Sequence, residues 1–296
     1  MSAPEGLLLL DKPAGITSHD LVNRVRSTLG TRKVGHAGTL DPMATGLMLV
    51  GVGRGTRLLR YLSGLDKTYE GALRLGETTD TLDADGQITH TAEVAVTRQE
   101  VAGAAAAMVG ESLQRPPAYS AVKVEGRKLY EAARAGEELE AEPRRIHVES
   151  FDVTTFDGHD ASFVVSCSSG TYVRVLGADL GAALGCGAHL VSLRRTRIGP
   201  YEVSVALQPD DEPVLLPVER MVDPLVRREL TEEEAVAVSY GRPLAALGTP
   251  GPVAVFDSGG RLLAVYRDRG DAARAEMVLP SAQAPEPSAA PPPEAS

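Results

Sequence analysis

The residues best suited to do chemistry lie in a glycine-rich loop around a single aspartate. Asp41 stands directly before Pro42, and three glycines lie in the twelve-residue stretch from Gly35 to Gly46. A proline disfavours the helical conformation of the preceding residue, so we expect Asp41 to be extended. An apolar run at 47–52 follows and predicts a buried strand that anchors the loop. The loop can therefore present one acid at a fixed angle, although such an Asp can also bind its own backbone as an Asx turn.

A second group of acids lies between Asp80 and Gly86. An EF-hand calcium loop starting at Asp83 would need a glycine and a glutamate where the chain has Ile88 and Val94. We therefore predict a turn in which the Asp side chains bind backbone amides, with one of them available to an arginine.

Length and composition limit the remaining possibilities. The 296 residues, 43% of them hydrophobic, suffice for one large domain or two smaller ones. The two cysteines, Cys167 and Cys186, have neither a disulfide pattern nor metal-ligand spacing, and the chain has no Gly-Lys-Ser/Thr phosphate-binding sequence. The first apolar run lacks a preceding basic segment, and no apolar run is long enough to span a bilayer. We expect a cytoplasmic protein that does not bind membranes.

The net charge of -10 argues against a nucleic-acid partner, because phosphate binding requires Lys and Arg. The charge is uneven, however, since residues 200–296 carry 8 Lys and Arg against 16 Asp and Glu. Basic clusters stand upstream of this segment, at 24–33, 54–60, 144–145 and 194–197. Each cluster alone is typical of a solvated surface, but together they are compatible with an RNA-binding face.

The hydrophobic pattern predicts many strands and few helices. Apolar runs and alternation favour strands at 7–10, 47–52, 67–76, 146–153, 161–168 and 189–194. Capping residues and helical periodicity favour helices at 17–29, 54–62, 97–109, 127–134 and 173–184. In the strand at 67–76, Tyr69 shares a face with Leu73 and Leu75, which is also typical of a core aromatic. The fold class predicted is α+β, with a mixed, largely antiparallel sheet flanked by helices.

Composition changes after Tyr201, which predicts a second folded segment. A polar stretch leads to a helix starting at Thr231, then to a hairpin at 253–266 and a further strand at 277–279. Residues 281–296 are rich in Ala, Pro and Ser and are predicted to be disordered. We expect a large domain at 1–205, a linker at 206–228, a small domain at 229–280 and a tail at 281–296.

Several blocks of sequence, spaced along residues 7–201 in one order, carry a family resemblance. The most specific block is Gly38-Thr39-Leu40-Asp41-Pro42-Met43-Ala44-Thr45-Gly46. The others are Asp11-Lys12-Pro13, Lys67-Thr68-Tyr69, Asp80 to Gly86, Pro116 to Lys123, Cys167 to Arg174 and Gly185 to Leu190. Together they resemble the TruB-type tRNA pseudouridine-55 synthases. The resemblance implies a pseudouridine synthase catalytic fold followed by a small PUA-like β-barrel that binds RNA.

The reaction implied is the isomerisation of uridine 55 in the T-loop of tRNA. The nucleotide is flipped out of the RNA, the N1–C1′ bond breaks, and the rotated base rejoins the sugar through C5. A flipped base needs a stacking partner and polar contacts to its edge. The isomerisation is redox-neutral, so the resemblance implies no cofactor and no metal.

The resemblance also implies roles for particular residues. Asp41 is the essential acid, acting as nucleophile or as base. Arg174 pairs with Asp41 through a bidentate contact that keeps the acid ionised and oriented. Tyr69 stacks on the target base, and its hydroxyl can serve in proton transfer. The other positions implied are Tyr172 and Leu193 in the uracil pocket, His36 beside the flipped nucleotide, and Lys12 as a phosphate contact.

Two other classes of function remain open at this point. One is an RNA-binding chaperone that opens and refolds the tRNA elbow with the same pocket. The other is a nucleoside hydrolase or glycosidase built on Asp41, which usually needs a second carboxylate or a metal-activated water. The central loop offers one acid, and the Asp80–Asp85 cluster is far along the chain. We expect a monomer, with tRNA as its partner.

Overall fold

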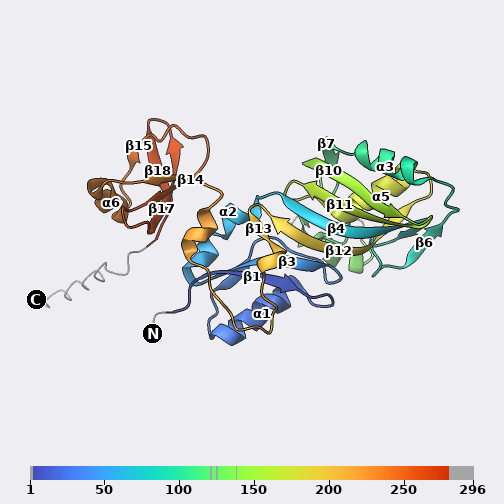
Figure 1. Cartoon of the computed structure of the whole chain (residues 1–296), viewed down its shortest axis with the longest axis horizontal. Coiled ribbons are helices and arrows are strands. Elements are labelled where there is room, and N and C mark those ends of the chain that lie inside the picture. The colour runs from blue at the N-terminus through green and yellow to red at the C-terminus, as the bar shows by residue number, and fades with distance from the viewer. Residues whose placement is uncertain (1–2, 121, 125, 138, 280–296) are drawn as a thin grey trace, which may run out of the picture. The chain divides into compact units, whose positions relative to one another are not determined.

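The computed structural model describes residues 3–120, 122–124, 126–137 and 139–279. The chain forms two compact units that divide after Leu216 (Figure 1). The division falls inside the segment 206–228 expected as a linker, where Leu207 and Leu216 form bridges to Leu10 and Leu7. The tail expected at 281–296 lies outside the described residues. None of the helices in the described ranges is long and apolar enough to cross a membrane.

The first unit is built on a nine-stranded sheet. Seven strands follow the order β1-β3-β12-β4-β11-β10-β7, while β2 pairs with β3 and β13 with β12. The pairing of β3 with β12 is parallel and the others are antiparallel, which confirms the predicted sheet. The bounds are β1 Gly6–Lys12, β2 Val34–His36, β3 Thr45–Val52, β4 Lys67–Leu75, β7 Gly110–Gln114, β10 Arg144–Phe156, β11 Asp160–Cys167, β12 Ala188–Ile198 and β13 Tyr201–Glu202.

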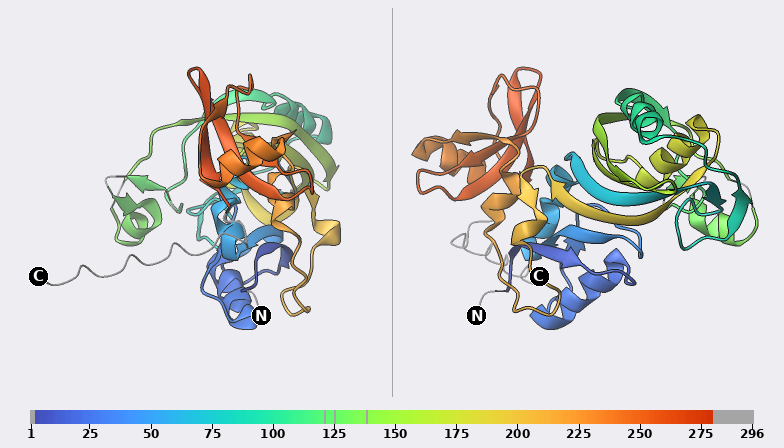
Figure 2. Two further views of the ribbon diagram at one scale, coloured as in Figure 1. Left: turned by 90° about the vertical axis from the view of Figure 1, so that its left-hand side faces the viewer. Right: turned by 45° about the vertical axis from the view of Figure 1, so that its right-hand side comes forward.

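Helices cover parts of this sheet, and two of them, α1 (Ser18–Leu29) and α3 (Arg98–Ala106), follow caps that the sequence predicts. Helix α1 starts at a capping box between Thr17 and Asp20 and ends at Gly30, whose φ is 60°. Helix α3 packs on β10, α5 (Val173–Ala183) packs on β12, and the two helices contact each other (Figure 2). The shorter helices are α2 Leu59–Ser63, η1 Gly53–Arg57 and η2 Val203–Val205.

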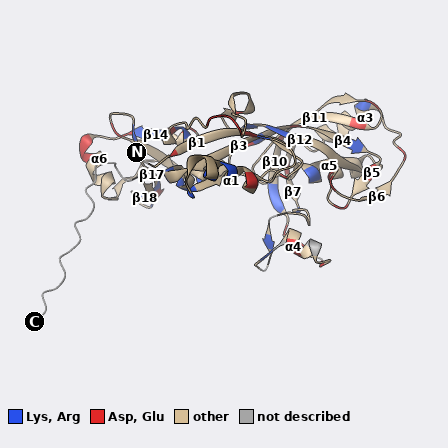
Figure 3. Ribbon diagram, turned by 90° about the horizontal axis from the view of Figure 1, so that it is seen from below, with Lys and Arg blue, Asp and Glu red and all other residues tan. Residues whose placement is uncertain are grey.

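Two small hairpins extend from the main sheet. Strands β5 (Glu77–Thr79) and β6 (Ile88–Thr91) enclose the acidic turn. Strands β8 (Lys123–Val124) and β9 (Arg127–Lys128) precede α4 (Leu129–Arg134), which stands away from the sheet in Figure 3. The helix expected from Arg127 therefore starts two residues later, because Arg127 and Lys128 pair with β8.

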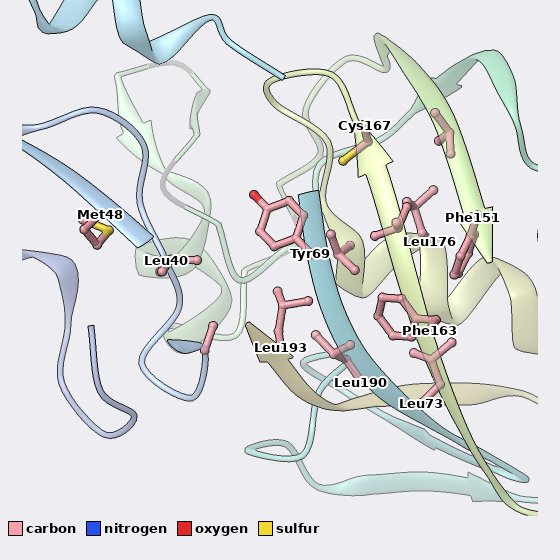
Figure 4. Close-up of a cluster of buried hydrophobic side chains, with 14 of the residues drawn as sticks. Leu40, Met48, Tyr69, Leu73, Phe151, Phe163, Cys167, Leu176, Leu190 and Leu193 are labelled. Carbon is pink, nitrogen blue, oxygen red and sulfur yellow. The ribbon is translucent and has the colours of Figure 1, made fainter. Parts of the chain in front are cut away.

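The core of the first unit lies between the sheet and its helices. Along β4, Tyr69, Leu73 and Leu75 are buried while Glu70 and Arg74 are exposed, which confirms the predicted alternation. The Tyr69 hydroxyl points away from Leu73 and Phe163 in Figure 4. Tyr69 thus has its ring in the core and its polar end at the border of the core.

The second unit is a five-stranded sheet with one α-helix and a core of its own. Its strands follow the order β14-β16-β17-β18-β15. The predicted helix, hairpin and last strand are all present, and the arrangement is that of a PUA-like domain. The bounds are η3 Val218–Val222, β14 Val226–Glu229, α6 Glu232–Ser239, β15 Leu244–Ala245, β16 Val253–Phe256, β17 Leu262–Arg269 and β18 Ala272–Val278.

Candidate active site

A pocket of about 950 Å³ opens in the first unit at the glycine-rich loop. Its walls come from the loop itself, from β4, from the acidic turn, from the start of α5 and from β12. Five of the seven predicted site residues line it, namely Asp41, Tyr69, Tyr172, Arg174 and Leu193. Chain segments far apart in the sequence therefore meet here, as the resemblance implied.

Asp41 and Arg174 form an ion pair in this pocket, with Nε of Arg174 3.0 Å from Oδ2 of Asp41. The bidentate contact expected between them is not formed. The other guanidinium nitrogens bind elsewhere, Nη1 to the Thr81 carbonyl at 2.8 Å and Nη2 to the Tyr119 carbonyl at 3.0 Å. Arg174 thus ties three segments of the pocket wall together while holding one oxygen of the acid.

Asp83 is the second carboxylate on Arg174, with Oδ2 3.2 Å from Nη1. Arg174 occupies the first turn of α5, where the helix dipole disfavours a cation, and its side chain is only 5% exposed. Two acids offset this cost. Asp83 was not predicted as a site residue, although the acidic turn was expected to offer one acid to an arginine, and this expectation is confirmed.

The two carboxylates differ in their access to the pocket. The side chain of Asp41 is 39% exposed, whereas that of Asp83 is 7% exposed. Oδ1 of Asp83 also accepts hydrogen bonds from the Thr81 hydroxyl and the Asp85 amide. The fold brings a second acid, Asp83, near Asp41. Asp83 is buried, so of the two carboxylates Asp41 is the one that a molecule entering the pocket could reach. A hydrolase with two working carboxylates requires both to reach the substrate.

Burial raises the pKa of Asp41 above its ordinary value, and the Asp83 carboxylate raises it further. The Arg174 guanidinium lowers the pKa but does not outweigh burial. The expectation that Arg174 keeps the acid ionised is therefore incomplete, because burial acts in the opposite direction. The surroundings of Asp41 therefore favour its protonated form more than water does.

The loop that carries Asp41 is fixed by side chains that form hydrogen bonds with its backbone. The Ser18 hydroxyl donates to the Leu40 carbonyl at 3.0 Å and accepts from the Leu40 amide at 2.9 Å. Arg195 donates to the carbonyls of Gly38 and Thr39. A loop with few strand partners still needs its buried polar groups paired, and these side chains meet that need.

Lys12 supports the same loop and does not lie where a phosphate could reach it. The residue is fully buried, and Nζ donates to the carbonyls of Pro13, Ile16 and Pro42 at 2.9, 2.8 and 3.2 Å. Burial lowers the pKa of Lys12 to about 8. The predicted phosphate contact is wrong, because the ammonium is used to join the turn after β1 to the Asp41 loop.

The remaining predicted residues are Tyr172, which lines the pocket, and His36, which does not. The Tyr172 backbone is fixed by Gln114, which donates to its carbonyl at 3.1 Å and accepts from its amide at 2.7 Å. His36 ends β2, which pairs with β3 inside the segment expected to be all loop, and it is not among the pocket-lining residues. Among the described residues, His36 Nδ1 and the pocket-lining Ser120 hydroxyl are buried without a hydrogen-bond partner.

Proteins in two solved structures of complexes have the same fold. The chain matches a protein in the crystal structure of a Cbf5-Nop10-Gar1 complex with a TM-score of 0.72 and 27% identity, over 93% of this chain and 85% of that one. It matches a protein in the structure of an H/ACA RNP bound to a substrate RNA containing 2′-deoxyuridine with a TM-score of 0.71 and 25% identity, over 92% and 84%. The predicted fold class is thereby confirmed.

Sequence relatives show the family to which this chain belongs. The TruB family pseudouridylate synthase N-terminal domain matches residues 26–173, the tRNA pseudouridylate synthase B C-terminal domain residues 174–223, and the tRNA pseudouridine synthase II C-terminal domain residues 225–280. The chain is 44% identical to tRNA pseudouridine synthase B of Paenarthrobacter aurescens, over 93% of this chain and 94% of that protein. It is 45% identical to the protein of the same name from Thermobifida fusca, over 93% and 98%. The chain belongs to the TruB family of pseudouridylate synthases.

Proposed function

We propose that this protein isomerises uridine 55 in the T-loop of tRNA to pseudouridine, with Asp41 as its essential group and without a cofactor. The observation that carries the proposal is one half-exposed carboxylate, held by a buried arginine at the wall of a pocket, in a chain of the TruB family. A pocket of about 950 Å³ is large enough for a nucleotide extruded from the RNA. No other acid with comparable exposure contacts Arg174 in the described chain.

The proposed steps use the residue roles that the family resemblance implies. The uracil ring stacks on Tyr69, with Tyr172 and Leu193 along its sides. Asp41 acts as nucleophile or base while the N1–C1′ bond breaks. The base then turns, the C5–C1′ bond forms, and the proton lost from C5 is balanced by the proton gained at N1. Arg174 steadies the carboxylate throughout, and His36 contacts the RNA beside the flipped nucleotide.

The test is incubation of the purified protein with an unmodified tRNA transcript, with no cofactor added, followed by mapping of pseudouridine. We expect one pseudouridine per tRNA at position 55, and none when that uridine is replaced by cytidine. A transcript that stays unmodified, or that is modified at another position, would contradict the proposal. A protein that speeds tRNA refolding equally well with Asp41→Asn would perform the chaperone task without the chemistry.

A further inference from the structure

Arg195 is a cation enclosed in the core beside the pocket. The residue is 1% exposed, and among the described residues no Asp or Glu forms a salt bridge with it. The sequence placed it in a basic cluster with Arg194 and Arg197, as part of a possible RNA-binding face. The structure gives it another place, because Arg194 turns outward to Asp11 while Arg195 turns into the core. An unpaired buried charge is costly, so its retention calls for a physical reason.

Every part of the guanidinium has a partner near the pocket. Nε donates to the Leu47 carbonyl at 2.8 Å, Nη1 to the Thr39 carbonyl at 3.3 Å and Nη2 to the Gly38 carbonyl at 3.2 Å. Nη2 also lies 3.0 Å from the sulfur of Met48. These partners belong to the loop that carries Asp41 and to the strand that follows it.

Tyr69 is the direct cross-strand neighbour of Arg195 in the pairing of β4 with β12. Burial raises the pKa of the Tyr69 hydroxyl, and the nearby Arg195 charge acts against that rise. A guanidinium has only donors, so in any hydrogen bond between the two side chains the Tyr69 oxygen is the acceptor.

Arg195 thus connects the two groups that a flipped uridine would meet. The guanidinium fixes the loop backbone two and three residues before Asp41, and its residue is the cross-strand neighbour of Tyr69. Its positive charge, not balanced by an acid, also favours electron density on the Tyr69 oxygen, because electrostatic effects are strong in a dry site. Asp41 is stabilised by a different arginine, so each reactive group has a cation of its own.

We propose that Arg195 is a positioning residue for the isomerisation, which orients the Tyr69 hydroxyl and fixes its ring relative to the Asp41 loop. This inference rests on the proposed function. Arg195 itself does not touch the substrate in this proposal. It acts through Tyr69 and through the carbonyls of Gly38 and Thr39.

The kinetic test compares Arg195→Gln, Arg195→Lys and the wild type in single-turnover pseudouridine formation with saturating tRNA. We expect Arg195→Gln to lower the rate by at least ~10-fold while the Kd for tRNA stays within about twofold, because the loss concerns orientation rather than binding. Arg195→Lys should recover part of the rate, since it keeps the charge but loses the planar fork. Arg74→Gln is the matched control, because Arg74 lies on the same strand as Tyr69 but pairs with Asp160 at the surface.

A double-mutant cycle separates this role from a merely structural one. If Arg195 acts through the Tyr69 hydroxyl, Arg195→Gln should cost much less in a Tyr69→Phe background than in the wild type. The second readout is spectroscopic and needs no activity. The protein has eight tyrosines, and labelling them at the 13Cζ position gives resonances among which Tyr69→Phe identifies that of Tyr69.

Arg195→Gln should move the Tyr69 resonance more than any other tyrosine resonance, and Arg195→Lys should move it less. Equal losses in both backgrounds, or an unmoved Tyr69 resonance in folded Arg195→Gln, would overturn the proposal. If the Tyr69→Phe protein has no measurable turnover, the double-mutant cycle cannot be completed, and the shift of the Tyr69 resonance decides the test. If the wild-type protein makes no pseudouridine, the proposed function is contradicted. The Tyr69 resonance still tests separately whether Arg195 orients the Tyr69 hydroxyl.

Discussion

Asp41 is held in an electrostatic environment that opposes its charge. Burial raises its pKa in the fold, so the folded state binds the proton of this group more tightly than the unfolded chain does. A group of this kind contributes stability at low pH, and that contribution is lost as the pH rises through the folded pKa. At neutral pH the ionised carboxylate therefore costs the fold stability, which is typical of a group kept for chemistry.

Replacement of this acid by its neutral isostere should separate activity from stability. Asp41→Asn should lower pseudouridine formation by at least ~10²-fold, as expected when an essential acid or base is lost. The same change should leave the melting temperature equal to or above that of the wild type at pH 7 to 8, because Asn mimics the protonated acid.

The difference in melting temperature between the two proteins should shrink as the pH falls, since wild-type Asp41 then becomes neutral too. Melting curves between pH 4.5 and 8 measure it. A wild type that is clearly more stable than Asp41→Asn at neutral pH would mean that the pair with Arg174 outweighs burial.

Asp83 should matter for the rate although it does not face the pocket. Its carboxylate is 3.2 Å from Nη1 of Arg174 and keeps the guanidinium in place. Asp83→Asn keeps the shape but loses the charge, so we expect a rate at least ~10-fold lower with nearly unchanged tRNA affinity.

The matched control is Asp80→Asn, an exposed acid of the same turn whose Oδ1 accepts from the Gln87 amide. Single-turnover rates and tRNA Kd values for both variants decide the matter. Equal rates for the two variants would show that Asp83 is only part of a turn.

At the residue level, the sequence could indicate Asp41, Arg174, Tyr69, Tyr172 and Leu193 but not their physical state. Motif resemblance identifies residue types at positions, and it cannot show which charges end up buried. The family resemblance predicts Lys12 and the basic cluster predicts Arg195 as charges available to RNA, whereas both are enclosed and bind backbone carbonyls. Burial depends on tertiary packing, which a local charge pattern does not encode.

Among the elements, the parallel contact between β3 and β12 positions the site. Arg194 pairs with Thr45 and Arg195 with Gly46 in this short stretch. Local signals predicted β3, β4, β12, α1 and α5, because alternation and caps act over a few residues. They could not predict which strands pair across the unit, nor that β2 forms within the loop, because those pairings join segments that are distant in sequence.

Gly46 tests the importance of this contact. Its φ is +104°, and a Cβ there would lie 2.3 Å from the Arg195 carbonyl oxygen. Gly158 has a matching φ of +105° with nothing within 4 Å, so Gly158→Ala measures the backbone strain alone.

We expect Gly46→Ala to lower the free energy of unfolding by ~1–3 kcal/mol more than Gly158→Ala, the usual range for overpacking. Urea unfolding of both variants gives the difference. Similar losses for the two variants would show that β3 and β12 can separate without cost.

For the whole molecule, the division into two units predicts a division of labour. All residues that line the pocket lie in the first unit, the last of them Arg195. The second unit belongs to an acidic segment, and some of its arginines are paired with acids, such as Arg261 with Asp257 and Arg267 with Glu276. Any affinity that it adds should come from shape and a few contacts rather than from bulk charge.

A truncated protein of residues 1–216 should therefore keep its single-turnover rate at saturating tRNA and bind tRNA ~10-fold more weakly, a loss of about 1.4 kcal/mol. Removal of residues 281–296 alone should change neither quantity, because that segment contains no Lys or Arg that could bind phosphate.

Rates and Kd values for both proteins provide the test, with circular dichroism to show that the shorter one is folded. Unchanged affinity after truncation at 216 would remove the RNA-binding role of the second unit. A folded protein that binds tRNA without turnover would place part of the site beyond residue 216.

The hydrogen bond from Arg195 to the Thr39 carbonyl joins positions 156 residues apart, and this has a consequence for biosynthesis. A ribosome adds about 5–20 residues per second, so the Asp41 loop leaves it many seconds before the strand that supports it. Contacts of such long range also slow folding after release. The nascent chain therefore carries its acid on an unsupported loop, and the competent pocket is among the last parts of the first unit to form.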